Sequence, residues 1–425
     1  MSTQKGNNMR IGIIGGGAAG MMAAIFAAKC GGNVTIMEHT GRIGKKILST
    51  GNGKCNFTNQ QLSKDDYNGN HPSFAEKILA RFDQFAAVDF FESIGMLTVS
   101  KRDGYYYPET GQASTVLNVL RYQLDSLGVC IMTETYIKEV RKCENGSFLV
   151  LTREKDYRFD KLILACGGNA APATGSDGSG YKLAIEFGHR IIRPLPVLTY
   201  LKSKEPSLKE LAGVRVNAGL SLFADDELLQ KEAGELQLNK DNISGIPVFQ
   251  LSHEAVQALA KKKKTEVFVD FLPKLSEESV YKRIYKLKEM YPHLPVSDVL
   301  CGMLHKKVCG AILNCNNLSF EKKMDKLSEK EIKALVSCIK CYTFLISGYP
   351  GFEAAQATMG GVDTAEIDEN MMSKIVDGLY FAGEIVDVDG RCGGYNLQWA
   401  WSSGFVAGCH SVNGETPCYE SVSVK

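Results

Sequence analysis

The chain has 425 residues, and its 49 lysines and arginines nearly balance 48 aspartates and glutamates, which leaves a formal net charge of +1. The length predicts about two or three domains, while the balanced charge and the lack of an apolar run of about 20 residues argue against nucleic-acid binding and membrane insertion. The 13 cysteines follow no small-scaffold pattern, so we expect reduced thiols in a cytoplasmic protein.

The first predicted elements have the order of a dinucleotide-binding βαβ unit: a strand at 11–14, a helix at 21–29 and a second strand at 34–37. Gly15, Gly17 and Gly20 lie after the first strand. They permit a tight turn, close approach of a pyrophosphate and close packing of helix on strand. A glycine-rich turn without a ligand is the alternative, and the glycines fit poorly with a secretory signal.

The ends of this unit carry groups suited to a nucleotide. The backbone at Ala18 and Ala19 would present N–H groups and the positive end of a helix dipole to phosphate. Glu38 follows the second strand directly, where a carboxylate accepts hydrogen bonds from ribose hydroxyls and disfavours a 2′-phosphate.

The next stretch, 41–59, is dense in Gly, Asn, Lys and Thr and shows little helical or strand periodicity. A mobile surface loop is one interpretation. However, a loop after the second strand would cross the phosphate edge of the site, where Lys45, Lys46 and Lys54 could neutralise phosphate. Gly51 and Gly53 would allow the backbone to approach closely.

The run R-x-G-x-K-x-x-x-[ST]-G-x-G-x-C-N-x-T-N, from Arg42 to Asn59, resembles the signature of the HI0933-like family of bacterial flavoproteins. This family includes aminoacetone oxidases and bile-acid reductases, and its members bind FAD. The resemblance implies contacts with FAD by His39, Arg42, Lys45, Lys46, Gly51, Gly53, Lys54, Cys55 and Asn56. Cys55 is as well explained by packing as by a redox role.

Other segments that resemble the family fall later in the chain, at 162–180, 243–252, 357–363 and 378–408. The resemblance implies a backbone contact of Ile137 with adenine. It also implies FAD contacts by Ala165, Gly167, Gly168, Gly383 and Glu384, and by a helix beginning near Asn396, with Asn396, Leu397 and Gln398 as backbone donors.

These segments predict an α/β fold with a doubly wound, Rossmann-like FAD-binding domain built from 1–190 and 356–425. An antiparallel, barrel-like β domain from 191–250 and 336–355 would be inserted, together with a helical lobe at 251–335. Residues 70–91 are predicted as one helix with a phenylalanine stripe. Cys338 and Cys341 form a C-x-x-C pair, but the cysteine spacings match no ligand pattern, so no metal is predicted.

The preferred functional hypothesis is an NAD(P)H-dependent reductase of the C=C bond of an enone in a small apolar substrate such as a 3-oxo-Δ4 or Δ4,6 bile acid or steroid. NADH or NADPH would bind transiently, because no second glycine fingerprint is evident. Tyr105, Tyr106 or Tyr107 could polarise the substrate carbonyl, although packing explains at least two of them. The alternatives are an amine oxidase that uses oxygen and a non-catalytic flavin-binding protein. The oligomeric state is left open.

Overall fold

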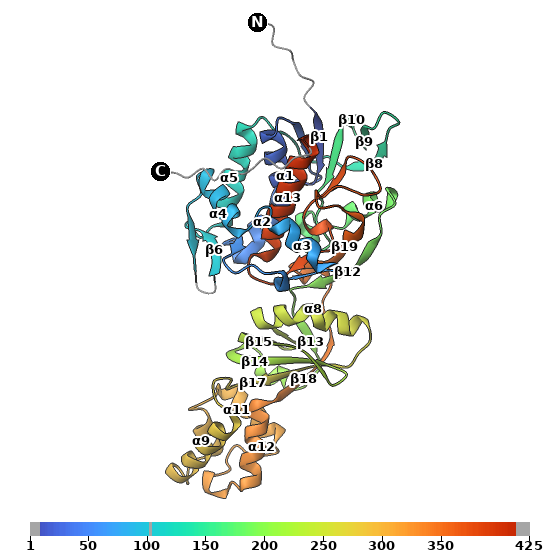
Figure 1. Ribbon diagram of the computed structural model, residues 1–425. Coiled ribbons are helices and arrows are strands. Elements are labelled where there is room, and N and C mark those ends of the chain that lie inside the picture. Colours follow the sequence, from blue (N-terminus) through green and yellow to red (C-terminus); the bar gives the residue numbers. More distant parts are fainter. Residues whose placement is uncertain (1–8, 102–103, 414–425) are drawn as a thin grey trace. The chain divides into compact units, whose positions relative to one another are not determined.

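The computed structural model describes residues 9–101 and 104–413, and the chain divides into two compact units. One, here called the sheet unit, is formed by residues up to 196 together with those from 355 onward. The other, the barrel unit, comprises residues 197–354. Figure 1 labels the elements of both.

The sheet unit is built around a five-stranded parallel sheet in the order β20-β11-β1-β2-β7. Its strands are β1 (Arg10–Ile14), β2 (Asn33–Met37), β7 (Cys130–Met132), β11 (Lys161–Leu164) and β20 (Leu379–Phe381). Ile13 pairs with Ile163 on one side and with Ile36 on the other, and all three side chains are fully buried. Such apolar strands need helices on both faces. The sheet confirms the predicted Rossmann-like α/β fold.

Two helices from opposite ends of the chain pack against each other in this unit. They are α1 (Ala18–Lys29) and α13 (Tyr395–Asn413), drawn in blue and red in Figure 1. A Cβ atom at Gly404 would lie 2.6 Å from the carbonyl oxygen of Ala19, and one at Gly408 would lie 2.4 Å from that of Ala23. The two glycines therefore set the close approach of the helices.

The region predicted as one helix at 70–91 forms two, α3 (Pro72–Leu79) and α4 (Gln84–Ser93). The break occurs because the Asp83 carboxylate accepts hydrogen bonds from the backbone of Phe85 and Ala86, 3.0 and 2.8 Å long, and so caps a new helix. Phe82 and Phe90 of the predicted stripe are buried, whereas Phe85 is 52% exposed.

The remaining elements of the sheet unit surround the sheet. The helices are α2 (Lys45–Ser49), α5 (Ala113–Ser126) and α6 (Ser179–Glu186). The strands form small sheets: β8 (Ile137–Lys142), β9 (Phe148–Thr152) and β10 (Asp156–Phe159); β3 (Thr58–Asn59), β5 (Thr98–Ser100) and β6 (Tyr105–Pro108); β4 (Tyr67–Asn68) and β21 (Asp389–Gly390); and β12 (Ile191–Val197) and β19 (Ala357–Val362).

The barrel unit contains a closed barrel of six strands in the order β13-β16-β15-β14-β17-β18. They are β13 (Leu201–Ser203), β14 (Val214–Ala224), β15 (Glu227–Leu238), β16 (Asn242–Ser244), β17 (Thr265–Asp270) and β18 (Tyr342–Gly348). Every second residue of β17 is buried, and β17 pairs antiparallel with both β14 and β18. This strand lies within the range assigned to helices in the sequence analysis, because its six residues are too few to stand out there.

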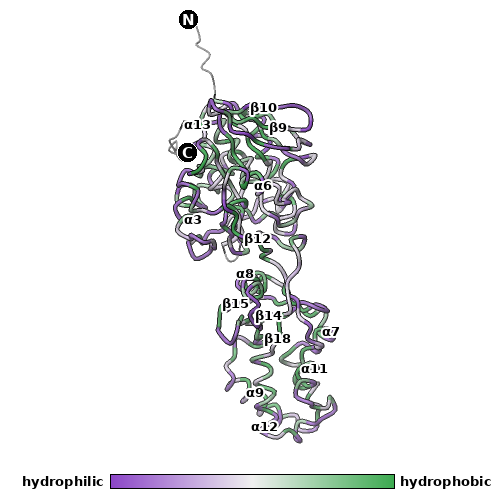
Figure 2. Tube along the Cα trace, turned by 90° about the vertical axis from the view of Figure 1, so that its right-hand side faces the viewer, coloured by the Kyte–Doolittle hydropathy of each residue, from purple (hydrophilic) through white to green (hydrophobic). Residues whose placement is uncertain are grey.

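The helices of the barrel unit are α7 (Leu208–Leu211), α8 (Ile246–Ala260), α9 (Glu277–Met290), α10 (Val296–Leu300), α11 (Lys306–Cys315) and α12 (Glu329–Lys340). The helix α8 packs on β15 and β14 and has a mainly hydrophobic trace in Figure 2. None of the helices in the described ranges combines the length and apolar character of a membrane-spanning segment.

Candidate functional site

A cavity of about 450 Å³ lies in the sheet unit at the carboxyl ends of its parallel strands. It is the position at which open α/β sheets bind ligands. Sixteen residues predicted from the sequence line it: Gly15, Gly17, Ala18, Ala19, Glu38, His39, Arg42, Lys45, Lys46, Ile137, Ala165, Gly167, Gly383, Glu384, Asn396 and Leu397. Segments far apart in the sequence therefore meet around one space.

The turn between β1 and α1 leaves a cradle for an anion. Gly15 has φ +106°, and a Cβ atom there would lie 2.4 Å from the carbonyl oxygen of Ala165. A Cβ at Gly20 would lie only 1.9 Å from the carbonyl oxygen of Gly15, whereas the space beside Gly17 is open. Because the first bond within α1 runs from Met21 N to Gly17 O, the preceding N–H groups are available at the helix start.

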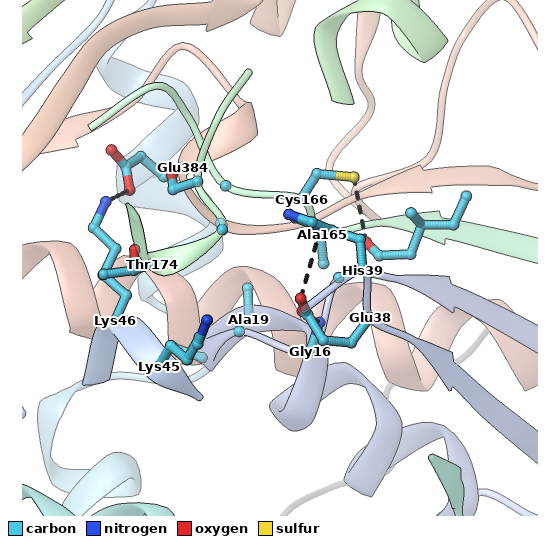
Figure 3. Close-up of a pocket in the computed structure, with 18 of the residues that line it drawn as sticks. Gly16, Ala19, Glu38, His39, Lys45, Lys46, Ala165, Cys166, Thr174 and Glu384 are labelled. Carbon is cyan, nitrogen blue, oxygen red and sulfur yellow. Dashed lines mark hydrogen bonds and ion pairs between the residues drawn. The ribbon is translucent and has the colours of Figure 1, made fainter. Parts of the chain in front are cut away.

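Glu38, at the end of β2, is buried and holds this turn in place. One carboxylate oxygen accepts a hydrogen bond from Gly16 N at 2.9 Å and the other accepts one from Thr40 N at 2.7 Å. Figure 3 shows Glu38 directed toward Gly16 beneath Ala165. Each oxygen keeps a second lone pair for a ligand hydroxyl, so the same carboxylate can shape the turn and bind a ribose.

One partly buried ion pair lies on the wall of the cavity. Lys46 Nζ is 2.6 Å from one oxygen of Glu384, and the other oxygen accepts a hydrogen bond from Thr358 N at 2.8 Å. Among the residues that the structure describes, Arg42 and Lys45 have no acidic partner. The cavity therefore has cationic side chains that can face phosphate.

Two side chains that the sequence analysis did not select, Tyr136 and Asp177, line the cavity near the predicted His39. Tyr136 has the Arg153 guanidinium over its ring at 4.3 Å and the His39 ring centroid at 5.9 Å. The two ring nitrogens of His39 lie 3.6 Å from Glu38 and 3.9 Å from Asp177. Burial acts to raise the pKa of Asp177, but hydrogen bonds from Ser179 and the nearby His39 hold that pKa below its ordinary value.

Cys166 also lines the cavity and was not selected. Its Sγ donates to Ile14 O at 3.4 Å, and burial raises the pKa of the thiol to about 12. The thiol is protonated at neutral pH, so its role here is packing and hydrogen bonding. The other lining residues missed are Ile14, Gly16, Met37, Gly44, Ile47, Thr50, Thr135, Lys138, Thr174, Gly175, Ser176, Ser179, Lys182, Leu183, Glu186, Gln356, Ala382, Trp399 and Ala400. The glycine-rich run before α6 is the sequence feature that could have identified some of these residues, namely those at 174–179.

The helix α13 begins at the cavity and is braced by the end of the predicted loop motif. Thr58 Oγ1 donates to Gln398 Oε1 at 2.6 Å, Asn59 Nδ2 donates to Gly393 O at 3.2 Å, and Trp401 Nε1 donates to Phe57 O at 2.9 Å. The first intrahelical bond shown is donated by Gln398 N to Gly394 O. The backbone N–H groups of Asn396 and Leu397 are thus available at the helix start.

Eight of the predicted cofactor residues do not line the cavity: Gly20, Gly51, Gly53, Lys54, Cys55, Asn56, Gly168 and Gln398. Gly20 and Gln398 shape the turn and the helix as described above. Cys55 is fully buried, and burial raises its thiol pKa to about 12. Oδ1 of Asn56 is buried and accepts no hydrogen bond from the described part of the chain.

Tyr105, Tyr106 and Tyr107 follow one another along β6, outside the lining of the cavity. Tyr106 packs edge-on against Phe57, with ring centroids 6.3 Å apart. Tyr107 has the Lys101 ammonium 5.0 Å from its ring centroid, and burial raises the pKa of its phenol. Within the described ranges, no three His, Cys, Asp or Glu side chains converge on a metal-binding position.

The parallel sheet, the glycine turn at a helix N-terminus and the acid at the end of β2 define a dinucleotide-binding protein of the Rossmann class. A family model described as "HI0933-like protein Rossmann domain" matches residues 9–410. The chain therefore belongs to the HI0933-like family. It is a flavin-dependent oxidoreductase, and the donors, cations and carboxylate around the cavity fit FAD.

Three relatives match the chain over nearly its whole length. The 3-dehydro-bile acid delta(4,6)-reductase of Clostridium scindens is 39% identical over 94% of this chain and 98% of that protein. A ribosomal RNA dihydrouridine synthase of Haemophilus influenzae is 30% identical over 92% of this chain and 96% of its own. The ribosomal RNA dihydrouridine synthase of Escherichia coli is 29% identical, with 92% and 95% covered.

Proposed function

We propose that this protein is an NAD(P)H-dependent reductase that saturates a C=C bond conjugated with a carbonyl in a small apolar substrate, such as a 3-oxo-Δ4 or Δ4,6 bile acid or steroid. The observation that carries the proposal is the 39% identity, over 98% of its length, with a 3-dehydro-bile acid delta(4,6)-reductase. In such a substrate the ring double bonds are conjugated with the 3-oxo group, which makes the distal carbon of each double bond electrophilic.

The same type of bond occurs in the substrate of the other relatives. A dihydrouridine synthase saturates the C5=C6 bond of uracil, which is conjugated with the C4 carbonyl. In the proposed reaction hydride adds to the carbon β to the carbonyl, or to the δ carbon when the distal bond of a Δ4,6 system is reduced, and a proton adds to the other carbon of the same double bond. One NAD(P)H and one proton are consumed for each bond saturated, and NAD(P)⁺ is released.

When bound, FAD supplies hydride transfer between the nicotinamide and the substrate. The N–H groups at Gly17, Ala18 and Ala19 would hold its pyrophosphate, with Arg42 and Lys45 as nearby cations. Glu38 would accept from the ribose hydroxyls.

The adenine would lie against Tyr136 and the backbone of Ile137. At the other end of the cavity, the N–H groups of Asn396 and Leu397 would donate to the flavin ring. The positive end of the α13 dipole favours negative charge there. The brace from Thr58 and Asn59 fixes the direction of these donors.

A second candidate function is reduction of uridine in RNA, and the charge of one segment favours it. The whole chain is nearly neutral, but residues 277–340 carry twelve lysines and arginines against eight acidic residues. The near-zero net charge of the whole chain argues against nucleic-acid binding, but this helical segment has an excess of basic residues, so that argument does not apply to it.

Anaerobic stopped-flow absorbance of the purified holoenzyme tests the proposal. Mixing with NADH or NADPH should bleach the flavin absorbance rapidly, and a 3-oxo-Δ4 steroid should restore it faster than oxygen does. Restoration by a uridine-containing RNA alone would favour the second candidate. Bleaching by aminoacetone but by neither nicotinamide, with fast reoxidation in air, would contradict both and indicate an amine oxidase.

A further inference from the structure

The packing of α1 on α13 brings two cysteines together at the end of α1. The glycine contacts described above advance by four residues on both helices, so the helices run in the same direction. Beyond these glycines, Phe405 of α13 packs edge-on against Phe26 of α1, with ring centroids 4.6 Å apart. Four residues further along each chain, Cys409 of α13 meets Cys30, which directly follows α1.

The two thiols share a hydrogen bond and differ in exposure. Cys30 is partly exposed, whereas Cys409 is fully buried, and neither forms a disulfide. The hydrogen bond with Cys409 lowers the pKa of the Cys30 thiol, although burial opposes the shift. The same bond and burial raise the pKa of Cys409. The buried thiol therefore acts as the donor, and the accessible thiol is the one that ionises first.

Cationic side chains lie beside this pair. Lys29 and Arg81 both interact electrostatically with Cys409. Positive charge stabilises a thiolate, and here it also offsets the negative end of the α1 dipole. Burial instead raises the thiol pKa of Cys55 and of Cys166 to about 12, so those two remain protonated. The pair at the end of α1 thus has the accessibility and the charge environment of a reactive thiol.

We propose that Cys30 and Cys409 form an oxidative modification site, at which a small peroxide such as hydrogen peroxide joins α1 to α13 through a disulfide. The Cys30 thiolate attacks one peroxide oxygen, the O–O bond breaks, and Cys30 becomes a sulfenic acid while the hydroxide that leaves takes up a proton. The Cys409 sulfur then attacks the sulfenic sulfur, and the S–O bond breaks. Its proton leaves with the sulfenic hydroxyl as water. Two thiols lose two electrons and two protons, and one peroxide becomes two waters.

This inference goes beyond the proposed reaction and does not depend on the identity of the substrate. Reduced flavin reacts with oxygen to give hydrogen peroxide, so a flavin-dependent oxidoreductase in air is itself a source of the oxidant. The disulfide would join the two helices whose N-terminal ends lie at the cavity. It would close a loop of nearly the whole chain, which should make the sheet unit harder to unfold.

The test uses the full-length holoenzyme, reduced, desalted and treated with hydrogen peroxide without substrate. Remaining thiols are alkylated, and mass spectrometry of the digest identifies the cross-linked peptides. We expect a peptide that joins Cys30 to Cys409 and has lost two hydrogen atoms. The Tm of the oxidised protein should rise by about 4 °C or more, and a reducing agent should reverse the rise.

Three variants separate the roles of the cysteines. Cys30→Ser, at a partly exposed position, should fold normally, form no cross-link and show no rise in Tm. In Cys409→Ala the resolving thiol is missing, so Cys30 should remain a sulfenic acid that dimedone traps. Cys130→Ser, which removes an exposed cysteine of β7, is the matched control and should cross-link like wild type.

Wild-type protein in which peroxide oxidises Cys130 but leaves Cys30 and Cys409 reduced would overturn the inference. A disulfide formed only between other hydrogen-bonded thiols, such as those of Cys315 and Cys338, would also overturn it. Because the peroxide is added directly, a cross-link that forms in protein whose flavin no nicotinamide bleaches would contradict the reductase proposal alone.

Discussion

The sheet unit and the barrel unit reach well-packed cores by different means. In the sheet unit the chain passes through contacts that only glycine allows, as at Gly15 and Gly20 beside the cavity and at Gly404 and Gly408 between helices. In the barrel unit one such contact occurs at Gly245, where a Cβ atom would lie 2.3 Å from the carbonyl oxygen of Glu235. The long strands, by contrast, alternate buried and exposed side chains, and a Cβ atom at Gly219 of β14 would meet its nearest neighbour at an ordinary 3.4 Å. The units therefore differ in how much backbone geometry their sequences must specify.

This difference has a chemical reason. A cavity that holds a dinucleotide must bring backbone N–H groups within hydrogen-bonding distance of phosphate, which leaves no room for side chains at the turn. A barrel core is filled by apolar side chains of suitable volume, and many sequences meet that condition. We expect substitutions in the sheet unit to affect cofactor binding sharply, and substitutions in the barrel unit to affect stability in proportion to the volume removed.

The largest effect is expected for Gly20→Ala, since the new methyl group would lie 1.9 Å from the carbonyl oxygen of Gly15. The turn between β1 and α1 must shift, so FAD affinity should fall by about 100-fold or more. Flavin content after gel filtration and titration of the apoprotein with FAD measure this. Gly219→Ala in β14 is the matched control and should retain FAD. Equal flavin content in the two variants would contradict the contrast between the units.

In the barrel unit, Leu222→Ala should lower the free energy of unfolding by about 2–5 kcal/mol. Leu222 is fully buried between β15 and β17 in the barrel core. Urea unfolding followed by circular dichroism measures the loss, while flavin fluorescence reports FAD release. Arg215→Ala, at an exposed position of the same strand, should change stability little. Loss of FAD from folded Leu222→Ala protein would contradict the expectation that substitutions in the barrel unit affect stability without affecting FAD binding.

The ion pair on the cavity wall should have an intermediate effect. Glu384→Gln keeps an acceptor for Thr358 N but removes the charge facing Lys46. Lys46→Met and Glu384→Gln should each weaken FAD binding by about tenfold, with a coupling of about 0.5–3 kcal/mol in the double variant. Isothermal titration with FAD measures all three. Additive effects of the two substitutions would indicate that the pair does not act as a unit.

The smallest effect concerns pH. The His189 side chain is fully buried between Glu366 Oε2, at 3.1 Å, and Ser373 Oγ, at 2.9 Å, and burial lowers its pKa despite the carboxylate. As the pH falls, His189 becomes protonated in the unfolded chain at a higher pH than in the folded protein. The stability that neutral His189 contributes is therefore present above the unfolded pKa of about 6.5 and is lost as the pH falls below that value.

The corresponding variant is His189→Gln, which keeps hydrogen-bonding groups and cannot titrate. Its Tm should fall less than that of wild type between about pH 7 and pH 5, with a difference of at most about 4 °C. Thermal melts of both proteins in matched buffers provide the measurement. A wild-type Tm that rises on acidification, or identical slopes for the two proteins, would contradict this assignment.

Parts of the fold that depend on neighbours in sequence could be predicted well. The glycine spacing and the acid at the end of β2 identified the turn, and both lie at the cavity. The break between α3 and α4 could not be predicted, because an aspartate such as Asp83 is equally compatible with the exposed surface of a continuous helix and with the cap of a new one. The strand β17 was missed because its partners β14 and β18 lie elsewhere in the chain.

The loop motif shows the same limit at the site. No role was predicted for Thr58 and Asn59 at its end, which hold Gln398 and Gly393, more than 300 positions away. Lys46 meets Glu384 across a similar separation. A pattern of residue types states which groups are available, but not which of them will face the ligand.

The sequence by itself determined the βαβ unit and the presence of an inserted antiparallel domain, because glycine φ preferences and side-chain periodicity act over a few residues. The family followed from the resemblance of the motif at 42–59 to the family signature. Only the tertiary structure decided the brace on α13 and the Lys46–Glu384 pair. These features depend on distances between segments remote in sequence. Those distances are set by packing of the whole core rather than by any local preference.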